Sequence, residues 1–169
     1  SRPRRFGKSL MISTLEAYFL GKRELFKGLA MESLEKDWTV HPVLHMDLNT
    51  EKYDTEASLE NKLELTLKQW EAEYGHNPDE YSVATRFEGV IRRAAKKMGQ
   101  KVVILIDEYD KPMLQAITNS ELQTKFRNTL KAFYGALKSC DGFIHFAMLT
   151  GVTKFSKVSV FSDLNNLRD

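Results

Sequence analysis

The feature that most constrains this chain is a run of five aliphatic residues, Val102 to Ile106, followed at once by Asp107 and Glu108. An aliphatic run without alternation is typical of a strand buried on both faces, as in the middle of a parallel sheet. Acidic side chains directly after such a strand lie at its carboxyl edge, where open α/β sheets bind their ligands. The run therefore predicts a central parallel strand with a polar site at its end.

The hydrophobic pattern of the rest of the chain predicts helices that alternate with further strands. Some segments repeat apolar residues at steps of three and four, and others are short and continuously apolar. We predict helices over residues 8–19, 56–74, 80–98 and 120–138, strands over residues 42–48 and 143–150, and a loop over residues 155–169. Strands separated by helices favour an α/β fold with a mainly parallel sheet and right-handed crossovers.

Composition and charge exclude several classes of protein. The 169 residues carry 25 basic and 23 acidic side chains, and the net charge of +2 is too small to support a nucleic-acid or membrane partner. A single cysteine, Cys140, excludes an intrachain disulfide and fits a reducing compartment. No segment has the apolar length of a signal peptide or of a membrane span. We expect one cytoplasmic domain, with nucleic-acid binding unsupported and no membrane partner.

A phosphate-binding motif stands at the start of the first predicted helix. Gly7, Lys8 and Ser9 match the end of the template G-x-x-x-x-G-K-[ST], in which backbone N–H groups hold phosphates and the lysine reaches the β and γ phosphates. Arg2 stands where the template has its first glycine, so a basic segment that caps an ordinary helix is a second interpretation. The residues expected to surround the phosphates are Arg5, Phe6, Gly7, Lys8, Ser9 and Leu10.

The acidic pair, which follows later in the chain, favours phosphate binding. A Gly-Lys-Ser helix start needs an acid at the end of a buried strand to hold Mg²⁺, and Asp107 has that position. Glu108 follows where ATPases of this kind place the base that activates water. Thr150 ends the next strand, where it serves either to hydrogen-bond the γ phosphate or only to end the strand. The candidate catalytic residues are Lys8, Glu108 and Thr150, and the candidate metal ligands are Ser9 and Asp107.

The chain resembles the AAA-ATPase-like domain family, bacterial P-loop ATPases that often carry a C-terminal nuclease-like domain. The resemblance covers nearly the whole sequence and lies in SRPRRFGKSL, LEAYFLGKRELFKGL, VVILIDEYDKP and LTGVTKFSKVSVFSDLNNL. It implies an ASCE-type P-loop fold, a three-layer sandwich around a mainly parallel sheet, with ATP and Mg²⁺ as ligands. It also implies that Lys8 binds phosphate, that Ser9 and Asp107 bind Mg²⁺ and that Glu108 is the catalytic base. In this family an arginine in place of the first loop glycine is usual.

We expect residues 1–169 to form a partial domain of this family, from the phosphate loop to the strand of Thr150 and the loop after it. The strand that precedes the phosphate loop and the nuclease-like domain are expected to lie outside it. Two functions remain open, namely ATP binding with Mg²⁺-dependent hydrolysis, and a nucleotide-binding switch or interaction module with little turnover. A metal nuclease built on Asp107 and Glu108 is a weaker alternative, because Gly-Lys-Ser would then have no role.

Two other groups of polar residues receive a structural interpretation. Residues 92–97 carry four basic side chains at the end of a predicted helix, where cations are favourable in any helix. A DNA-facing patch or an arginine supplied to a neighbouring subunit is the alternative. His41 and His45 lie on one face of a predicted strand, yet no cysteine or further acid completes a zinc site beside them.

Overall fold

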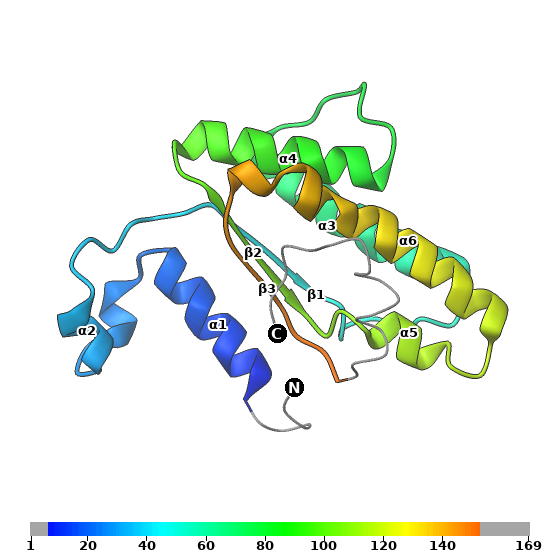
Figure 1. The fold of residues 1–169 in the computed structure, drawn as a ribbon, viewed down its shortest axis with the longest axis horizontal. Helices are drawn as coiled ribbons and strands as arrows, with labels where there is room; N and C mark the ends of the chain where they lie inside the picture. Colours follow the sequence, from blue (N-terminus) through cyan, green and yellow to red (C-terminus); the bar gives the residue numbers. More distant parts are fainter. Residues whose placement is uncertain (1–6, 153–169) are drawn as a thin grey trace.

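The computed structural model describes residues 7–152, and Figure 1 shows their arrangement. The elements in chain order are α1 (Lys8–Phe19), the 3₁₀ helix η1 (Arg23–Phe26), α2 (Ala30–Leu34), β1 (Val43–Asp47), α3 (Glu56–Tyr74), α4 (Val83–Met98), β2 (Val102–Asp107), α5 (Lys111–Gln115), α6 (Ser120–Ser139), the 3₁₀ helix η2 (Asp141–Phe143) and β3 (Ile144–Leu149). The predicted helices and strands are confirmed, with small shifts at their ends. The loop predicted over residues 155–169 lies outside the described residues.

The three strands form one parallel sheet in the order β1-β2-β3. Asp47 lies opposite Asp107, and Ile106 lies opposite Leu149, so the carboxyl ends of the strands meet at one edge. Every residue of β2 is buried, as its aliphatic run predicts. The α/β class and the parallel sheet are therefore confirmed.

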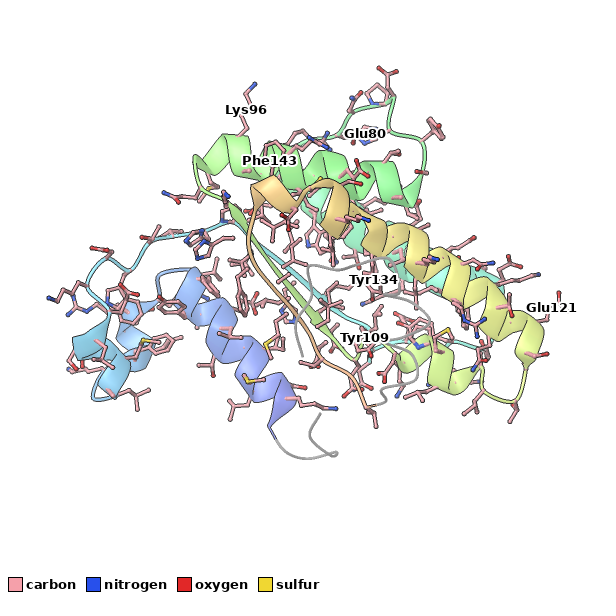
Figure 2. All side chains as sticks on the ribbon, viewed as in Figure 1. Glu80, Lys96, Tyr109, Glu121, Tyr134 and Phe143 are labelled. Atoms are coloured by element: carbon pink, nitrogen blue, oxygen red, sulfur yellow. The ribbon has the colours of Figure 1, made fainter. Side chains whose placement is uncertain are left out.

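Helices cover both faces of this sheet, with α1 on one face and α3, α4 and α6 on the other (Figure 1). Because alternate residues of a strand point to opposite faces, β2 contributes to two cores. Ile104 belongs to the larger core with α3, α4 and α6, whereas Leu105 packs with Ile12 and Phe19 of α1. Figure 2 labels Tyr134 on α6, where its side chain is fully buried. The sheet is thus sandwiched between helices at its centre.

Local capping explains where α4 begins. The backbone N–H of Thr85 donates to the Ser82 hydroxyl, and the N–H of Ser82 donates to the Thr85 hydroxyl, both at 3.1 Å. This reciprocal capping box starts the helix at Val83 and not at the predicted residue 80.

None of the helices within residues 7–152 combines the length and apolar character needed to cross a membrane.

An ion-paired group fixes α3 against α4. The Arg86 guanidinium donates to both carboxylate oxygens of Glu71 at 2.8 Å and to one oxygen of Glu64 at 2.6 Å. Arg86 and Glu71 are each only 9% exposed. The hydrogen bonds from Arg86 hold the pKa of Glu71 below its ordinary value of 4.5. Because α3 and α4 both contribute to the larger core, the Arg86–Glu71 ion pair helps to fix the helical layer that covers this face of the sheet.

Candidate functional site

The carboxyl edge of the sheet gathers predicted site residues from three separate segments. Asp107 is the last residue of β2, Glu108 follows it, and Thr150 follows β3. Lys8 and Ser9 form the first turn of α1, and their side chains reach the same edge. The contacts join residues 98 and 143 positions apart in the chain. The fold therefore assembles a site from the residues that the sequence nominated separately.

Lys8 connects the start of α1 to the ends of both β2 and β3. Its Nζ lies 3.4 Å from Glu108 Oε1 and donates to the Gly151 carbonyl oxygen at 3.1 Å. The side chains of Lys8 and Glu108 are 12% and 18% exposed, so the ion pair is largely shielded from water. Shielding strengthens such a pair relative to one on an open surface. The cation is thus held at the strand ends in a defined position.

Asp107 is hydrogen-bonded from both sides. The Ser9 hydroxyl donates to Asp107 Oδ2 at 2.6 Å, and the Thr150 hydroxyl donates to Asp107 Oδ1. Asp107 is 4% exposed, so these hydroxyls replace the water that a carboxylate would otherwise bind. The carboxylate is consequently fixed next to the first turn of α1.

Thr150 also holds the backbone of Glu108. The N–H of Glu108 donates to the Thr150 hydroxyl at 3.3 Å, and the N–H of Tyr109 donates to the Thr150 carbonyl at 2.8 Å. Glu108 has φ of 55°, a left-handed conformation that is uncommon and costly outside glycine. Figure 2 labels Tyr109 beside it, in the turn between β2 and α5. Thr150 therefore stabilises a strained turn that presents the acidic pair.

The amino end of α1 has the features of an anion-binding helix start. Gly7 occupies the N-cap with φ of 74°, and no side chain within residues 7–152 caps the helix there. The first N–H groups of a helix have no partner inside the helix, and together with the helix dipole they favour an anion. The positive φ favours glycine at position 7, and space is not the reason, since a Cβ there would meet no atom within 4 Å.

The described residues of the predicted phosphate-binding set are Gly7, Lys8, Ser9 and Leu10. Arg5 and Phe6 lie outside the described residues. The side chain of Leu10 is 71% exposed on the first turn of α1, so any contact with phosphate would come from its backbone. The structure thus brings together Lys8 and Ser9 of this set with the acids.

The sequence does not single out Gly151, and it explains Asp110 equally well as an extension of the site or as part of a loop ion pair with Lys111. The Gly151 carbonyl accepts from Lys8, and Asp110 accepts from the backbone N–H of Val152 at 2.8 Å. Asp110 is fully buried. The signals were present in the sequence, as a third acid two residues after Glu108 and a glycine directly after the apolar strand, but neither residue type at these positions is specific by itself.

Two basic residues near the end of α4 make contacts with other segments of the chain. Arg93 binds the Glu80 carboxylate with two hydrogen bonds of 2.6 and 3.0 Å, and Lys97 donates to the Glu73 carbonyl at 2.6 Å. The first contact joins α4 to the loop before it, and the second joins α4 to the last turn of α3. Figure 2 shows Lys96 projecting outward from the helix.

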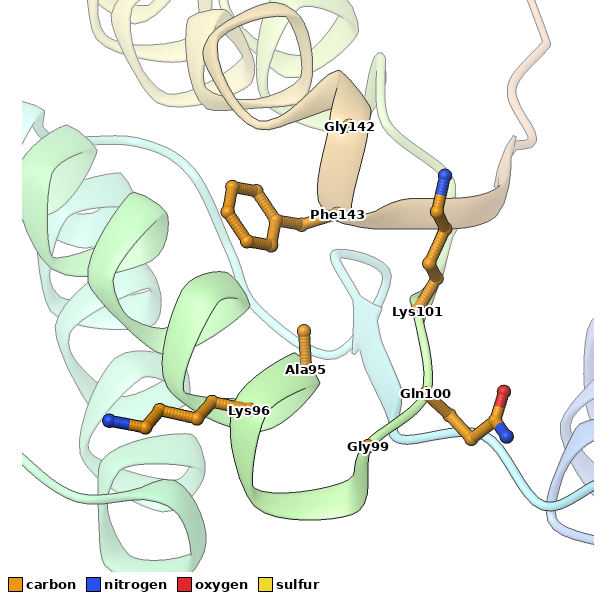
Figure 3. Close-up of a pocket in the computed structure, with 7 residues that line it drawn as sticks. All are labelled: Ala95, Lys96, Gly99, Gln100, Lys101, Gly142 and Phe143. Carbon is orange, nitrogen blue, oxygen red and sulfur yellow. The ribbon is translucent and has the colours of Figure 1, made fainter.

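A pocket of about 260 Å³ lies beside this helix end (Figure 3). Residues 99–101 and 142–143 line it, and they precede β2 and β3, so the pocket is at the amino edge of the sheet. Lys96 and Lys101 belong to its lining, but Figure 3 shows their side chains pointing in different directions. The pocket therefore lacks converging charges and stands apart from the candidate site.

The histidines form no metal site among the described residues. His41 stacks on His145 with ring centroids 4.3 Å apart, and its Nδ1 lies 2.8 Å from the Lys101 carbonyl oxygen. His45 contacts the Glu16 carboxylate at 3.0 Å. Burial, with the nearby His41 and Lys101, lowers the pKa of His145 below 6.5. These contacts are explained by packing of the sheet against α1.

Comparison with known proteins identifies the family of the chain. Residues 1–161 match the family described as "Predicted AAA-ATPase". The "Uncharacterized protein in vnfD 5'region" of Azotobacter chroococcum mcd 1 is 42% identical over 170 residues, which cover 100% of this chain and 33% of that protein. The chain therefore spans about a third of the length of this relative. No solved structure matches the chain significantly. From the match over most of its length, the chain belongs to the AAA-ATPase-like family.

Proposed function

We propose that this chain binds ATP with Mg²⁺ at the carboxyl edge of its sheet and hydrolyses the terminal phosphate. The observation that carries the proposal is the contact between a Gly-Lys-Ser helix start and an acidic strand end. Ser9 Oγ lies 2.6 Å from Asp107 Oδ2, and Lys8 Nζ lies 3.4 Å from Glu108 Oε1. Family membership supports nucleotide binding, and helices on both faces of a parallel sheet support an ASCE-type P-loop fold.

The side chains at this edge suit Mg²⁺. This ion takes oxygen ligands, and nucleotide sites commonly hold it with one or two protein groups together with the substrate phosphates. The Ser9 hydroxyl and the Asp107 carboxylate provide two adjacent oxygens. No group of three or more His, Cys, Asp or Glu suited to a metal occurs within residues 7–152, and a site completed by phosphate oxygens does not need one. When bound, Mg²⁺ would neutralise charge on the β and γ phosphates.

Each residue then has a defined part in hydrolysis. The ammonium group of Lys8 and the first N–H groups of α1 bind phosphate oxygens. Glu108 orients a water molecule and accepts its proton as the water oxygen bonds to the γ phosphorus and the bond to the β–γ bridging oxygen breaks, which leaves ADP. Thr150 contacts Asp107 and the backbone of Glu108, so we assign it to holding the acids in place.

Phosphate binding requires Lys8 to change partners. Its ammonium group has three donors and contacts Glu108 and the Gly151 carbonyl. A phosphate bound by Lys8 competes with the Glu108 carboxylate, while the hydrogen bond to the Gly151 carbonyl is kept. The exchange frees the Glu108 carboxylate to contact water only when phosphate is bound. This exchange also favours the second candidate function, a nucleotide-dependent switch, because a released Glu108 changes the site without any turnover.

Two substitutions test the proposal. With ATP and Mg²⁺, the unmodified chain should gain thermal stability and release phosphate. Lys8→Ala should abolish the gain in melting temperature. Glu108→Gln should keep that gain and lower phosphate release by about 10²- to 10⁴-fold, the usual contribution of a general base. Lys96→Ala is the matched control, since it removes a lysine at the amino edge of the sheet.

The outcomes distinguish the two functions. Normal hydrolysis by the Glu108→Gln variant would exclude Glu108 as the base. An undiminished thermal response in Lys8→Ala would exclude the proposed phosphate site. A thermal response to ATP without phosphate release from the unmodified chain would instead identify the nucleotide-binding switch.

A further inference from the structure

The segment after β3 is clamped against the turn after β2. The N–H of Tyr109 donates to the Thr150 carbonyl at 2.8 Å, and the N–H of Val152 donates to Asp110 Oδ2 at 2.8 Å. We call Tyr109, Asp110, Gly151 and Val152 the strand-end clamp. It joins residues 42 positions apart, beyond the last pairing of β2 with β3.

Gly151 allows the two sides of the strand-end clamp to approach closely. A Cβ at position 151 would lie 2.5 Å from Tyr109 Cε1 and 2.8 Å from Asp110 Oδ1, distances that real Cβ atoms do not reach. Glycine is therefore required here for space. The peptide held in this way carries the carbonyl oxygen that accepts from Lys8 Nζ at 3.1 Å.

Helix capping does not explain Asp110. It stands at the N-cap of α5, a position where aspartate usually accepts from the first turn, yet its side chain makes no capping hydrogen bond. The carboxylate instead accepts from Val152 and is fully buried. Burying a carboxylate costs free energy that a neutral side chain would not cost. The buried acid therefore lies in the strand-end clamp, next to the candidate site.

We propose that Asp110 is a positioning residue for ATP hydrolysis, an inference that rests on the function proposed above. By holding the Val152 N–H, Asp110 fixes the Gly151 carbonyl that orients Lys8. The same clamp keeps Thr150 beside Asp107 and the backbone of Glu108. Asp110 acts on the reaction through these groups, without contacting the nucleotide.

Two substitutions at Asp110 separate this role from general packing. Asparagine keeps a side-chain oxygen that can accept from Val152, whereas alanine leaves that N–H without its acceptor. Gln115→Ala is the matched control. Gln115 lies in the adjacent α5, and its side-chain oxygen accepts from the N–H of Tyr53 at 2.6 Å, so the substitution removes a side-chain acceptor outside the strand-end clamp. The measurements are kcat and KM for ATP with Mg²⁺, made well below the melting temperature of each variant.

Asp110→Ala should lower kcat about tenfold or more, with a smaller change in KM, as expected when catalytic groups are displaced by a fraction of an ångström to an ångström. Asp110→Asn should recover most of the rate, and Gln115→Ala should stay within about twofold of the unmodified chain. A normal kcat in Asp110→Ala overturns the proposal. So does an equal loss in the asparagine and alanine variants, or in Gln115→Ala.

Amide hydrogen exchange tests the strand-end clamp without nucleotide. Asp110→Ala should speed exchange at the amides of Val152 and Tyr109, whereas Asp110→Asn should not. Unchanged exchange in Asp110→Ala overturns the inference whatever the enzyme does. An unmodified chain that neither binds nor hydrolyses ATP overturns the proposed function and the catalytic role of Asp110 together, while the exchange result still decides whether the clamp exists.

Discussion

Replacing Thr150 by valine isolates the energetic contribution of one hydroxyl to the site. The side chain keeps its shape, but Asp107 loses a hydrogen bond to a charged oxygen and the Glu108 N–H loses its acceptor. A hydrogen bond to a charged group contributes about 1.5–3 kcal/mol and a neutral one about 0.5–1.5 kcal/mol. Because Asp107 is 4% exposed, water has little access to replace the lost donor. We expect the free energy of unfolding to fall by about 2–4 kcal/mol.

Urea unfolding measures this loss directly. With a denaturant slope of about 2 kcal/mol per molar urea, the midpoint should fall by roughly 1–2 M. Thr150→Ser is the control, since it keeps the hydroxyl and removes only a methyl group that contributes about 0.8 kcal/mol. A Thr150→Val variant that unfolds at the wild-type midpoint, or a serine variant less stable than the valine variant, would refute the assignment of Thr150 as the group that holds the acids.

Two further predictions concern residues away from the site. Arg86→Met should lower the free energy of unfolding, measured in urea, by about 3–5 kcal/mol, because Glu71 remains largely buried without its arginine. Adding Glu71→Leu should restore much of this loss, and a double variant as unstable as Arg86→Met would contradict this account. His145 has a pKa below 6.5 in the folded chain, so the unfolded chain binds more protons near that pH. Its contribution to stability is therefore complete above pH 6.5 and is lost as the pH falls through the lower folded pKa. Unfolding free energies measured from about pH 5 to 7 should show a positive slope that His145→Gln reduces, and an equal slope in both proteins would exclude His145 as its source.

Long periodic segments were predictable from the sequence, whereas short elements were not. The aliphatic run of β2 and the repeating leucines of α3 depend on local pattern alone, and both elements occur as predicted. In contrast, η1 exposes Leu25 and α2 exposes Leu34, so neither element shows an apolar period. Their place depends on packing of Phe26 against Tyr18 and Trp38, which lie elsewhere in the chain. Tertiary contacts of this kind leave no local signature.

The candidate site divides in the same way. The spacing of Gly-Lys-Ser and the acids after an aliphatic strand were sufficient to nominate Lys8, Ser9, Asp107 and Glu108, because both patterns are local. The roles of Gly151 and Asp110, in contrast, depend on the close approach of the segments that follow β2 and β3. Such an approach is visible only once the register of β2 with β3 is known.

The distance along the chain between Lys8 and its partner Gly151 has a consequence for the order in which the protein is made. At roughly 5–20 residues per second, a ribosome needs about 7–30 s to add the 143 residues that separate them. Helix α1 spends most of this interval without β2 and nearly all of it without β3, against which Ile12 and Phe19 later pack. Closing so long a loop also has an entropic cost that local contacts do not carry. We therefore expect docking of α1, and with it completion of the site, to be a late step of folding.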